Sequence, residues 1–233
     1  GPFAGLQQAS LVWLRIFIEK MNWKFPTYEI DLPLDWDKLS KSFSWIEDMQ
    51  GVPQDPVWHA EGDVYVHTQM VVEALLEQPE FKAMSEEDRH VMMAAALLHD
   101  VEKRSTTQTE RIEGEERITS PGHAKKGEYT SRDILYRAIP SPFHLRETVA
   151  KLVRLHGLPL WAIDKPDPQK AVIEASLLVD TQKLAVLARA DVLGRICADH
   201  QEMLLRIEMF EELCKENDCF GKPRSFASAY GRF

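Results

Sequence analysis

The segment VMMAAALLHD at residues 91–100 is an apolar run that ends in an adjacent histidine and aspartate. The cap sequence Ser85-Glu-Glu-Asp precedes it, and apolar residues recur within it at helical spacing, so we expect a buried helix. Neighbouring helical residues point about 100° apart, so His99 and Asp100 can reach a common point only where the helix ends. The polar residues from Glu102 onward are consistent with that end.

Four further side chains of metal-ligating type accompany this pair. His67 begins a helical segment with apolar residues on its following turns, and Asp191 lies inside the apolar segment LAVLARADVLGR. Divalent metals that activate water are held by imidazole and carboxylate groups on rigid elements. A metal would also remove the cost of burying an unpaired carboxylate. The candidate ligands in chain order are His67, His99, Asp100, His123, His156 and Asp191.

Each of these side chains also has an ordinary structural explanation. A single histidine is more often a capping, surface or hydrogen-bonded core residue than a ligand. Asp191 alone could equally form a buried ion pair with Arg189 or Arg195. The ordered combination of six favours a metal site. We assign ordinary roles to the remaining candidates His90, His144 and His200.

Composition and charge limit the classes of protein and partner. With 233 residues, 44% hydrophobic residues and only 11 glycines, one compact domain is favoured over two. The 37 acidic residues exceed the 28 Lys and Arg residues, giving a net charge of -9. This charge disfavours binding nucleic acid over a broad surface, and leaves a local basic pocket open as an alternative.

Cysteine usage and hydropathy indicate a soluble cytoplasmic protein. Cys197, Cys214 and Cys219 lack the paired spacing of a zinc site or disulfide framework, so we expect reduced thiols. No apolar stretch approaches the ~20 residues needed to span a bilayer, and no basic segment followed by an apolar region opens the chain. We therefore expect no membrane association. Gly1 and Pro2 are left out of the fold prediction as a protease-cleavage remnant.

Helical periodicity predicts a mainly α-helical fold. Prolines at 26 and 33 predict a loop, VPQDP at 52–56 a link, and the polar segment 103–119 a surface excursion with a hairpin around Gly114. No P-loop and no G-x-G-x-x-G fingerprint occurs. The expected helices are 6–21, Asp35 or Asp37 to Gly51, 64–76, 85–98, 122–137, 142–155, Lys170 or Ser176 to His200, and 201–216.

His67, LLHDVEK at 97–103 and LARADVLGR at 187–195 together resemble the HD-domain phosphohydrolase superfamily, whose pattern is a His, an adjacent His-Asp pair and a late Asp. The resemblance covers roughly residues 55–200 and implies an all-α helical bundle with a central metal site. The domains expected are an N-terminal helical extension (1–54), an HD phosphohydrolase core (55–217) and a C-terminal tail (218–233).

SPGHAKKG at 120–127 and VRLHGLPL at 153–160 look like the additional histidine motifs of HD proteins with two metal ions. The resemblance implies that Asp100 bridges the ions and that a bridging water or hydroxide attacks phosphorus in line. It implies one ion on His67, His99 and Asp191, and the other on His123 and His156. Imidazole and carboxylate ligands suit Mn, Ni, Co, Fe, Cu and Zn, with Mg less favoured.

The EGD, GHAKKG and HGLPLW contexts are especially similar to the HD module ahead of a P-loop polynucleotide 5′-kinase in bacterial end-healing enzymes. That likeness implies removal of 2′,3′-cyclic, 2′- or 3′-phosphates from RNA or DNA ends, or from nucleotides. The segment CFGKPRSFASAYGRF looks like the junction leading into such a kinase. The tail is thus predicted to link to a kinase domain on the same natural chain.

Catalytic and substrate-binding roles follow from this resemblance. Asp100 would bridge the metals and Lys103 would neutralise charge in the transition state. His59 and Glu61 are candidates for orienting His67 or reaching substrate, and an ordinary loop role is the alternative for both. The predicted phosphate-binding cations are Lys103, Lys125, Lys126, Arg132 and Arg154, with Arg104 and Arg146 as weaker candidates. A solvated helix face is the alternative for Lys125 and Lys126. Core or lid packing is expected for Trp13, Trp23, Trp45 and Trp161.

Two other functions stay open at this point. One is a phosphohydrolase of free mononucleotides, which the acidic net charge favours. The other is a non-catalytic, metal-containing RNA-binding or positioning module, since the HD domain of tRNA nucleotidyltransferases has a similar arrangement. The oligomeric state is not predicted.

Overall fold

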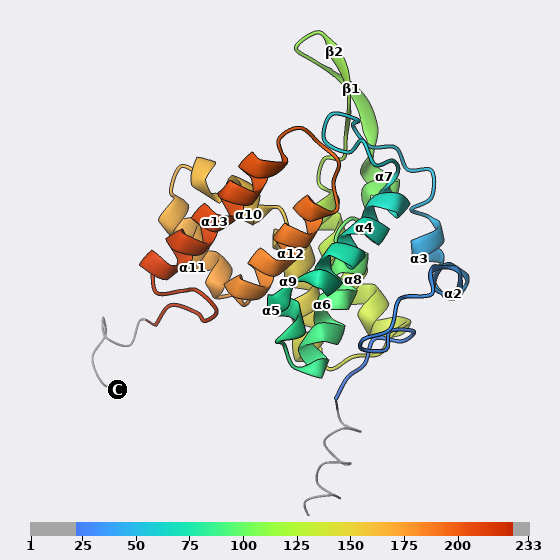
Figure 1. Cartoon of the computed structure of the whole chain (residues 1–233), viewed down its shortest axis with the longest axis horizontal. Coiled ribbons are helices and arrows are strands. Elements are labelled where there is room, and N and C mark those ends of the chain that lie inside the picture. The colour runs from blue at the N-terminus through green and yellow to red at the C-terminus, as the bar shows by residue number, and fades with distance from the viewer. Residues whose placement is uncertain (1–21, 226–233) are drawn as a thin grey trace, which may run out of the picture.

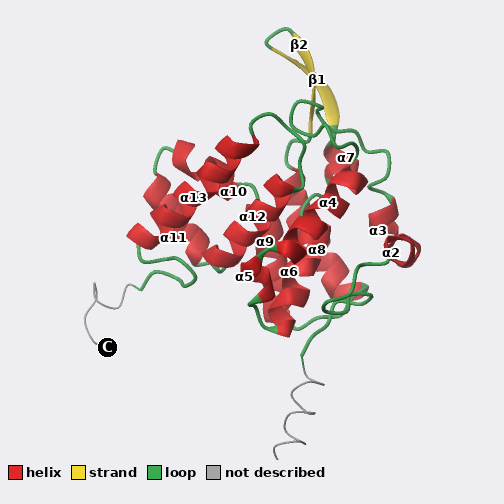
Figure 2. Ribbon diagram, viewed as in Figure 1, coloured by secondary structure: helices red, strands yellow, loops and turns green. Residues whose placement is uncertain are grey.

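The structure, a computed structural model, describes residues 22–225, and these fold mainly into helices (Figures 1 and 2). The expected all-α bundle is confirmed, with a small two-stranded sheet projecting from it among the described residues. The elements are α2 (Trp36–Ser42), α3 (Ser44–Glu47), α4 (Val64–Glu77), α5 (Pro79–Lys82), α6 (Glu86–Leu98), α7 (Lys103–Thr106), β1 (Gln108–Ile112), β2 (Glu115–Thr119), α8 (His123–Arg137), α9 (Phe143–Leu155), α10 (Leu158–Trp161), the 3₁₀ helix η1 (Ala162–Asp164), α11 (Pro168–Ser176), α12 (Thr181–Leu193) and α13 (His200–Glu216).

Helix α12 lies in the middle of the molecule and connects two groups of helices (Figure 1). On one side it packs against α4, α6 and α9, and on the other against α10, α11 and α13. Its sequence explains this position, because nine of its residues, from Thr181 to Val192, are buried. A helix that is apolar on nearly all sides must be covered by neighbours. The buried run of α6 fits against α4, α9 and α12 for the same reason.

Side-chain caps set where several helices begin. Asp63, Ser85 and Asp180 each accept a hydrogen bond from a backbone N–H in the first turn of α4, α6 and α12, respectively. Such a cap satisfies an N–H that has no partner within the helix. These polar residues therefore fix the start of the helices that carry His67, His99 and Asp191.

Two of the expected helices are shorter than predicted. The prediction of one helix from Lys170 or Ser176 to His200 is wrong. The chain turns after α11, and Asp180 caps a second helix, α12, which ends at Leu193. The helix expected up to Gly51 is divided at Phe43, which is extended between α2 and α3. Apolar spacing continues through both breaks, so periodicity alone did not reveal them.

The other secondary-structure predictions agree with the structure, apart from short additions such as α5, α10 and η1. The hairpin is confirmed, with Gln108 opposite Thr119 and Ile112 opposite Glu115. Gly114 supplies a positive φ of 86° at its turn.

The expected helix at 6–21 lies outside the described residues. Side chains from 23–49, including Phe25 and Leu39, belong to the main hydrophobic core, and the boundary at 54/55 stays a prediction.

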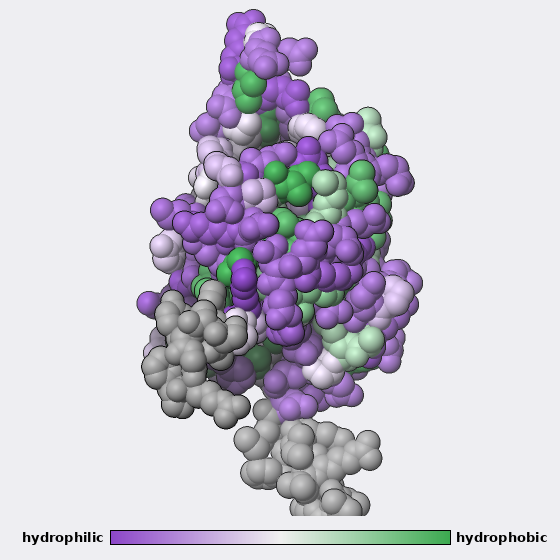
Figure 3. Space-filling view, turned by 90° about the vertical axis from the view of Figure 1, so that its left-hand side faces the viewer, coloured by the Kyte–Doolittle hydropathy of each residue, from purple (hydrophilic) through white to green (hydrophobic). Residues whose placement is uncertain are grey.

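The surface in Figure 3 is mostly hydrophilic, with hydrophobic residues scattered across it. Such scattered exposure is ordinary for a folded chain. Among residues 22–225, none of the helices combines the length and apolar character that crossing a bilayer requires.

Candidate metal centre

Helix ends bring the candidate ligands together. His99 is the C-terminal cap of α6 and His156 the C-terminal cap of α9, while His123 is the first residue of α8. His67 lies in the first turn of α4, and Asp191 lies near the end of α12. The prediction that the helix carrying His99 ends there is confirmed. The chain turns immediately after it and directs both members of the histidine–aspartate pair inward.

Asp100 lies at the centre of this cluster, and its two carboxylate oxygens face different histidines. Its Oδ2 lies 3.2 Å from His99 Nε2 and 3.7 Å from His67 Nε2. Its Oδ1 lies 3.3 Å from His123 Nε2 and 3.6 Å from His156 Nε2. One buried carboxylate thus separates two groups of imidazoles.

Asp191 joins the first group and also forms an ion pair. Its Oδ1 lies 3.0 Å from His67 Nε2 and 3.9 Å from His99 Nε2, and its Oδ2 lies 2.7 Å from Arg195 Nη2. The ion pair considered as an alternative is therefore present with Arg195, whereas Arg189 pairs with a glutamate on α13. Arg195 Nε also donates to Asp191 Oδ1 at 3.2 Å, so the ion pair and the histidine group share this carboxylate.

The outer ring nitrogen of every candidate histidine faces an acceptor, which orients Nε2 toward the centre. His67 Nδ1 lies 2.8 Å from Glu61 Oε1 and 3.2 Å from Gly194 O. The other three rings donate to the carbonyl three residues earlier: His99 to Ala96 (2.7 Å), His123 to Ser120 (2.8 Å) and His156 to Val153 (2.7 Å). Ala96 and Val153 are in the last turns of α6 and α9, where carbonyls lack helical partners. This arrangement is typical of histidines that bind metal.

The donor atoms fit divalent ions on both sides of Asp100. Two ligands about 2.1 Å from one ion, at right angles, are about 3 Å apart, and the separations here begin at 3.0 Å. Among the described residues, His99 Nε2 and Asp100 Oδ1 are buried without a hydrogen-bond partner. Leaving such an atom unsatisfied costs about 1–3 kcal/mol. The groups that could hold an ion are His67 with His99 and Asp100, Asp100 with His123 and His156, and His59 with Glu61 and His67.

Burial and charge set the protonation of these groups. Burial alone would raise the pKa of Asp100, but His99 and Lys103 outweigh it and hold that pKa well below its ordinary value. Burial lowers the pKa of His156 to about 3. Burial also opposes the charged form of His67, yet hydrogen bonds with Asp191 and Glu61 raise its pKa. Asp100 is thus an anion and His156 a neutral imidazole, the forms that bind metal.

Lys103 lies against the same carboxylate. Its Nζ is 2.8 Å from Asp100 Oδ2 and donates to Gln54 Oε1 at 2.8 Å. The neighbouring residue Glu102 is also buried, but its carboxylate lies away from Asp100 and accepts hydrogen bonds from Thr130 and Arg104. The structure therefore places the lysine ammonium beside Asp100, and leaves the glutamate outside the cluster.

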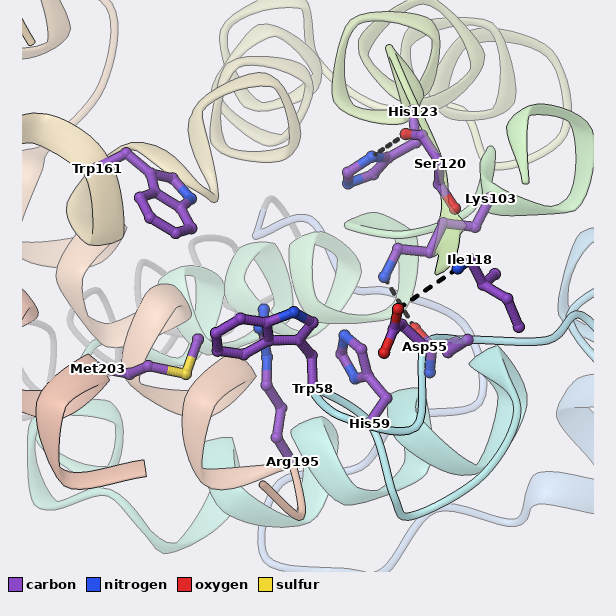
Figure 4. Close-up of a pocket in the computed structure, with 11 residues that line it drawn as sticks. Asp55, Trp58, His59, Lys103, Ile118, Ser120, His123, Trp161, Arg195 and Met203 are labelled. Carbon is purple, nitrogen blue, oxygen red and sulfur yellow. Dashed lines mark hydrogen bonds between the residues drawn. The ribbon is translucent and has the colours of Figure 1, made fainter. Parts of the chain in front are cut away.

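A cavity of about 430 Å³ opens beside the cluster (Figure 4). His123 and Lys103 reach its wall, so the second group of donors is accessible from it. The side chain of His123 is 25% exposed, whereas those of His67 and His99 are fully buried. The walls are formed by Gln54, Asp55, Trp58, His59, Lys103, Ile118, Ser120, His123, Trp161, Arg195 and Met203.

The other predicted cations do not line this cavity. Arg132 pairs with Glu128 and Glu147, and Arg154 lies 3.7 Å from Glu128. Lys126 is exposed and donates to a serine of α7, and Lys125 is exposed. The weaker candidates are also elsewhere, with Arg104 paired to Asp48 and Glu102, and Arg146 over the rings of Tyr136 and Phe143. Lys103 alone of the predicted cations is brought to the cavity among the described residues.

Several wall residues were not singled out by sequence. Gln54 comes from the proline-rich link, Trp58 lies two residues after it, and Met203 comes from α13. The link's position just before the EGD motif was the signal that could have indicated the first two. His59 and Glu61 are at the site as expected, with Nδ1 and Oε1 2.8 Å apart.

The remaining histidines and tryptophans divide as follows. Backbone hydrogen bonds hold His90, which accepts from Phe25 N, and His200, which donates to Val192 O. His144 is exposed. Trp23 and Trp45 are buried in the core as expected, and Trp13 lies outside the described residues. Trp161 is 53% exposed and lines the cavity, so it does not pack in the core, and the lid role stays a prediction for it.

Comparisons with known proteins identify the family. No curated protein matches the chain. The HD domain family matches residues 64–196, a stretch that contains all six candidate ligands from His67 to Asp191. Proteins of this family are generally metal-dependent hydrolases. Because the match covers more than half of the 233 residues, the chain belongs to the HD-domain family.

Proposed function

We propose that this protein is a metal-dependent phosphoesterase whose ligands are the six predicted residues. His67, His99 and Asp191 would hold one ion, His123 and His156 the other, and Asp100 would contribute one oxygen to each. The observation that carries the proposal is the placement of Asp100, whose two oxygens face separate imidazole groups, one of them open to the cavity.

The chain's own residues would orient and neutralise the reacting groups. Bound divalent ions would supply Lewis acidity and lower the pKa of a coordinated water. Asp100 and Asp191 offset the positive charge, and the backbone acceptors keep the imidazoles in the tautomer with a free Nε2. Lys103, beside Asp100 and on the cavity wall, would bind a phosphoryl oxygen and stabilise charge that develops on it.

We propose 2′,3′-cyclic, 2′- or 3′-phosphates at nucleic-acid ends or on nucleotides as substrates. The likeness of the sequence contexts to end-healing enzymes supports this choice. The cavity also supports it, because about 430 Å³ accommodates a chain end or a single nucleotide. A kinase domain on the same natural chain stays a prediction.

A phosphohydrolase of free mononucleotides is the second candidate function. The net charge of -9 favours it, since a long phosphate backbone would be repelled over much of the surface. A non-catalytic RNA-binding module is less favoured, because the complete ligand set lies beside an accessible cavity.

Product analysis separates these functions. Metal-loaded protein is incubated with a nucleoside 2′,3′-cyclic phosphate, a nucleoside 3′-phosphate, and oligonucleotides that carry the same ends. We expect metal-dependent cleavage of the end phosphate in the oligonucleotides. Cleavage of mononucleotides alone would favour the second function, and RNA binding without any cleavage would favour the module.

A further inference from the structure

The cavity beside Asp100 has two chemically different regions. Lys103 and His123 mark the region next to the metal centre. Away from these residues, the wall contains the large apolar side chains of Trp58, Trp161 and Met203 (Figure 4). A ligand that fills the cavity would therefore carry a phosphoryl group at one end and a flat apolar group at the other.

Trp161 is held in an exposed position by its neighbours. Its side chain is 53% exposed, and the guanidinium of Arg206 lies over its ring, 5.5 Å from the centroid. Arg206 is itself fixed, since it donates to Asp164 Oδ2 at 2.7 Å and to Leu160 O at 3.2 Å. A large ring that is both exposed and held in place is suited to stacking, because little side-chain entropy is lost on binding.

Trp58 lies on a turn, next to His59, that hydrogen bonds hold in place. The backbone N–H of Trp58 donates to the carbonyl oxygen of Asp55 at 3.1 Å, and Asp55 Oδ2 accepts from Arg117 Nε at 2.6 Å. Arg117 belongs to β2, so the hairpin holds this turn against the cavity. Trp58 is half-buried, and in Figure 4 its indole overlaps the side chain of Arg195, with Met203 on the same side of the view.

We propose that Trp58 and Trp161 form a nucleobase subsite, in which the base of the phosphate-bearing nucleotide stacks on an indole while its phosphate lies at the metal centre. This inference rests on the proposed function and adds the residues that recognise the substrate. Every base offers a π-face, so the subsite would accept different bases. Stacking needs no long phosphate backbone, which suits a chain with a net charge of -9.

Binding of a non-hydrolysable substrate analogue tests the subsite without turnover. Titration calorimetry measures the affinity of the metal-loaded protein for the 3′-methylenephosphonate analogue of adenosine 3′-monophosphate and for inorganic phosphate. We expect Trp58→Ala and Trp161→Ala each to weaken nucleotide binding about tenfold, the scale of one base–aromatic stack. Trp58→Phe and Trp161→Phe should retain most of the affinity, and inorganic phosphate should bind all variants equally.

Tyr136→Ala is the matched control, because Tyr136 is an aromatic residue, 66% exposed, outside the cavity. It should leave nucleotide binding unchanged. Thermal unfolding of each variant identifies any that fail to fold. For those positions the phenylalanine variants are compared with Trp58→Leu and Trp161→Leu, in which the side chain is close to phenylalanine in size but has no aromatic face.

The outcomes for the subsite and for the proposed function are distinguishable. Nucleotide affinity that is unchanged when the aromatic faces are lost, or an equal loss for nucleotide and inorganic phosphate, would overturn the subsite. With catalysis present, the alanine variants should raise KM for nucleotide substrates with kcat nearly unchanged. Base-dependent binding without cleavage of any phosphoester would support the subsite and reject the proposed function.

Discussion

At the scale of single residues, the chemistry is concentrated on buried charges that are compensated by their neighbours. Asp100 and Asp191 are almost fully buried, and a buried carboxylate is costly without partners. Lys103 Nζ lies 2.8 Å from Asp100 Oδ2, and Arg195 donates to Asp191 Oδ2 at 2.7 Å and to Asp191 Oδ1 at 3.2 Å. The Oδ1 atoms of both aspartates also face histidine Nε2 atoms. Within the described part of the chain, Asp100 Oδ1 is buried without a hydrogen-bond partner, so this is the oxygen where a cation would be most strongly bound.

Replacing Lys103 by Gln tests its role beside Asp100. The amide keeps much of the side-chain size but removes the charge, so we expect kcat to fall about 10²-fold, the effect of losing one donor to a developing anion. Metal content, measured on the same preparations, should be unchanged because the six ligands remain. The matched control is Lys125→Gln, which removes an exposed lysine that does not line the cavity. Equal kcat values for the two variants would remove Lys103 from the mechanism.

The sequence was sufficient to predict that the candidate ligands meet, because each has a metal-ligating side chain at a helix end or inside an apolar helix. The cavity walls could not be predicted in this way. Gln54, Trp58, Ile118 and Met203 come from segments far apart in the chain, and only the folded backbone brings them together. Arg132 and Arg154 illustrate the opposite case, since nearness in sequence to His123 and His156 did not place them at the cavity.

At the scale of helices, the close approach of α12 and α4 positions candidate ligands of the proposed metal centre. Gly194 follows α12, and a Cβ there would lie 2.7 Å from the backbone nitrogen of Val71 on α4. Gly194 O also lies 3.2 Å from His67 Nδ1. The absent side chain therefore lets the helix carrying Asp191 approach the helix carrying His67.

Gly194→Ala should separate these helices. We expect the free energy of unfolding to fall by about 1–3 kcal/mol, the usual cost of overpacking, and metal affinity to fall with it. Chemical denaturation and metal titration measure the two effects. Gly157→Ala is the control, because nothing lies within 4 Å of a Cβ at that position. Equal stability of both variants would contradict the proposed close approach.

The ion-pair network between α8 and α9 should make stability depend on pH. Burial would raise the pKa of Glu128, but hydrogen bonds from Lys151 and Arg132 outweigh it and lower that pKa below its ordinary value of 4.5. The folded state therefore binds the proton less readily than the unfolded state. The contribution of ionised Glu128 to stability is fully present above pH 4.5, and it is lost as the pH falls through the lowered pKa.

Glu128→Gln isolates this contribution. At pH 7 we expect the free energy of unfolding of the variant to be about 1–3 kcal/mol lower than that of the unchanged protein. This difference should shrink as the pH falls below 4.5. Denaturation at a series of pH values measures it. Glu73→Gln, on the exposed side of α4, should give a small and constant difference. A Glu128→Gln difference that does not change with pH would contradict the assignment.

Most helices could be predicted from periodicity, because burial of one face follows the chain's own spacing. The breaks at Phe43 and after α11 depend on tertiary packing and on the cap at Asp180, which periodic spacing does not report. The hairpin was predicted because a turn glycine, Gly114, lies in a short polar segment.

At the scale of the whole molecule, the proposed metal centre connects α4, α8 and α12 with the ends of α6 and α9. Metal binding should therefore stabilise the complete fold. At 100 times Kd a bound ion adds about 2.7 kcal/mol, which raises Tm by roughly 5–10 °C. Differential scanning calorimetry with and without chelator measures this shift. Asp100→Asn should show little of it, and an equal shift in both proteins would place metal binding elsewhere.

The most direct test of the account is the rate of phosphate-ester cleavage by chelator-treated protein that has been reloaded separately with Mn, Ni, Co, Cu, Zn and Mg. The substrate is a nucleoside 2′,3′-cyclic phosphate, and Asp100→Asn is measured in parallel. We expect cleavage with at least one transition metal and a loss of at least about 10³-fold in the variant, because both ions would share Asp100. Equal rates in the two proteins, or no cleavage with any metal, would contradict it.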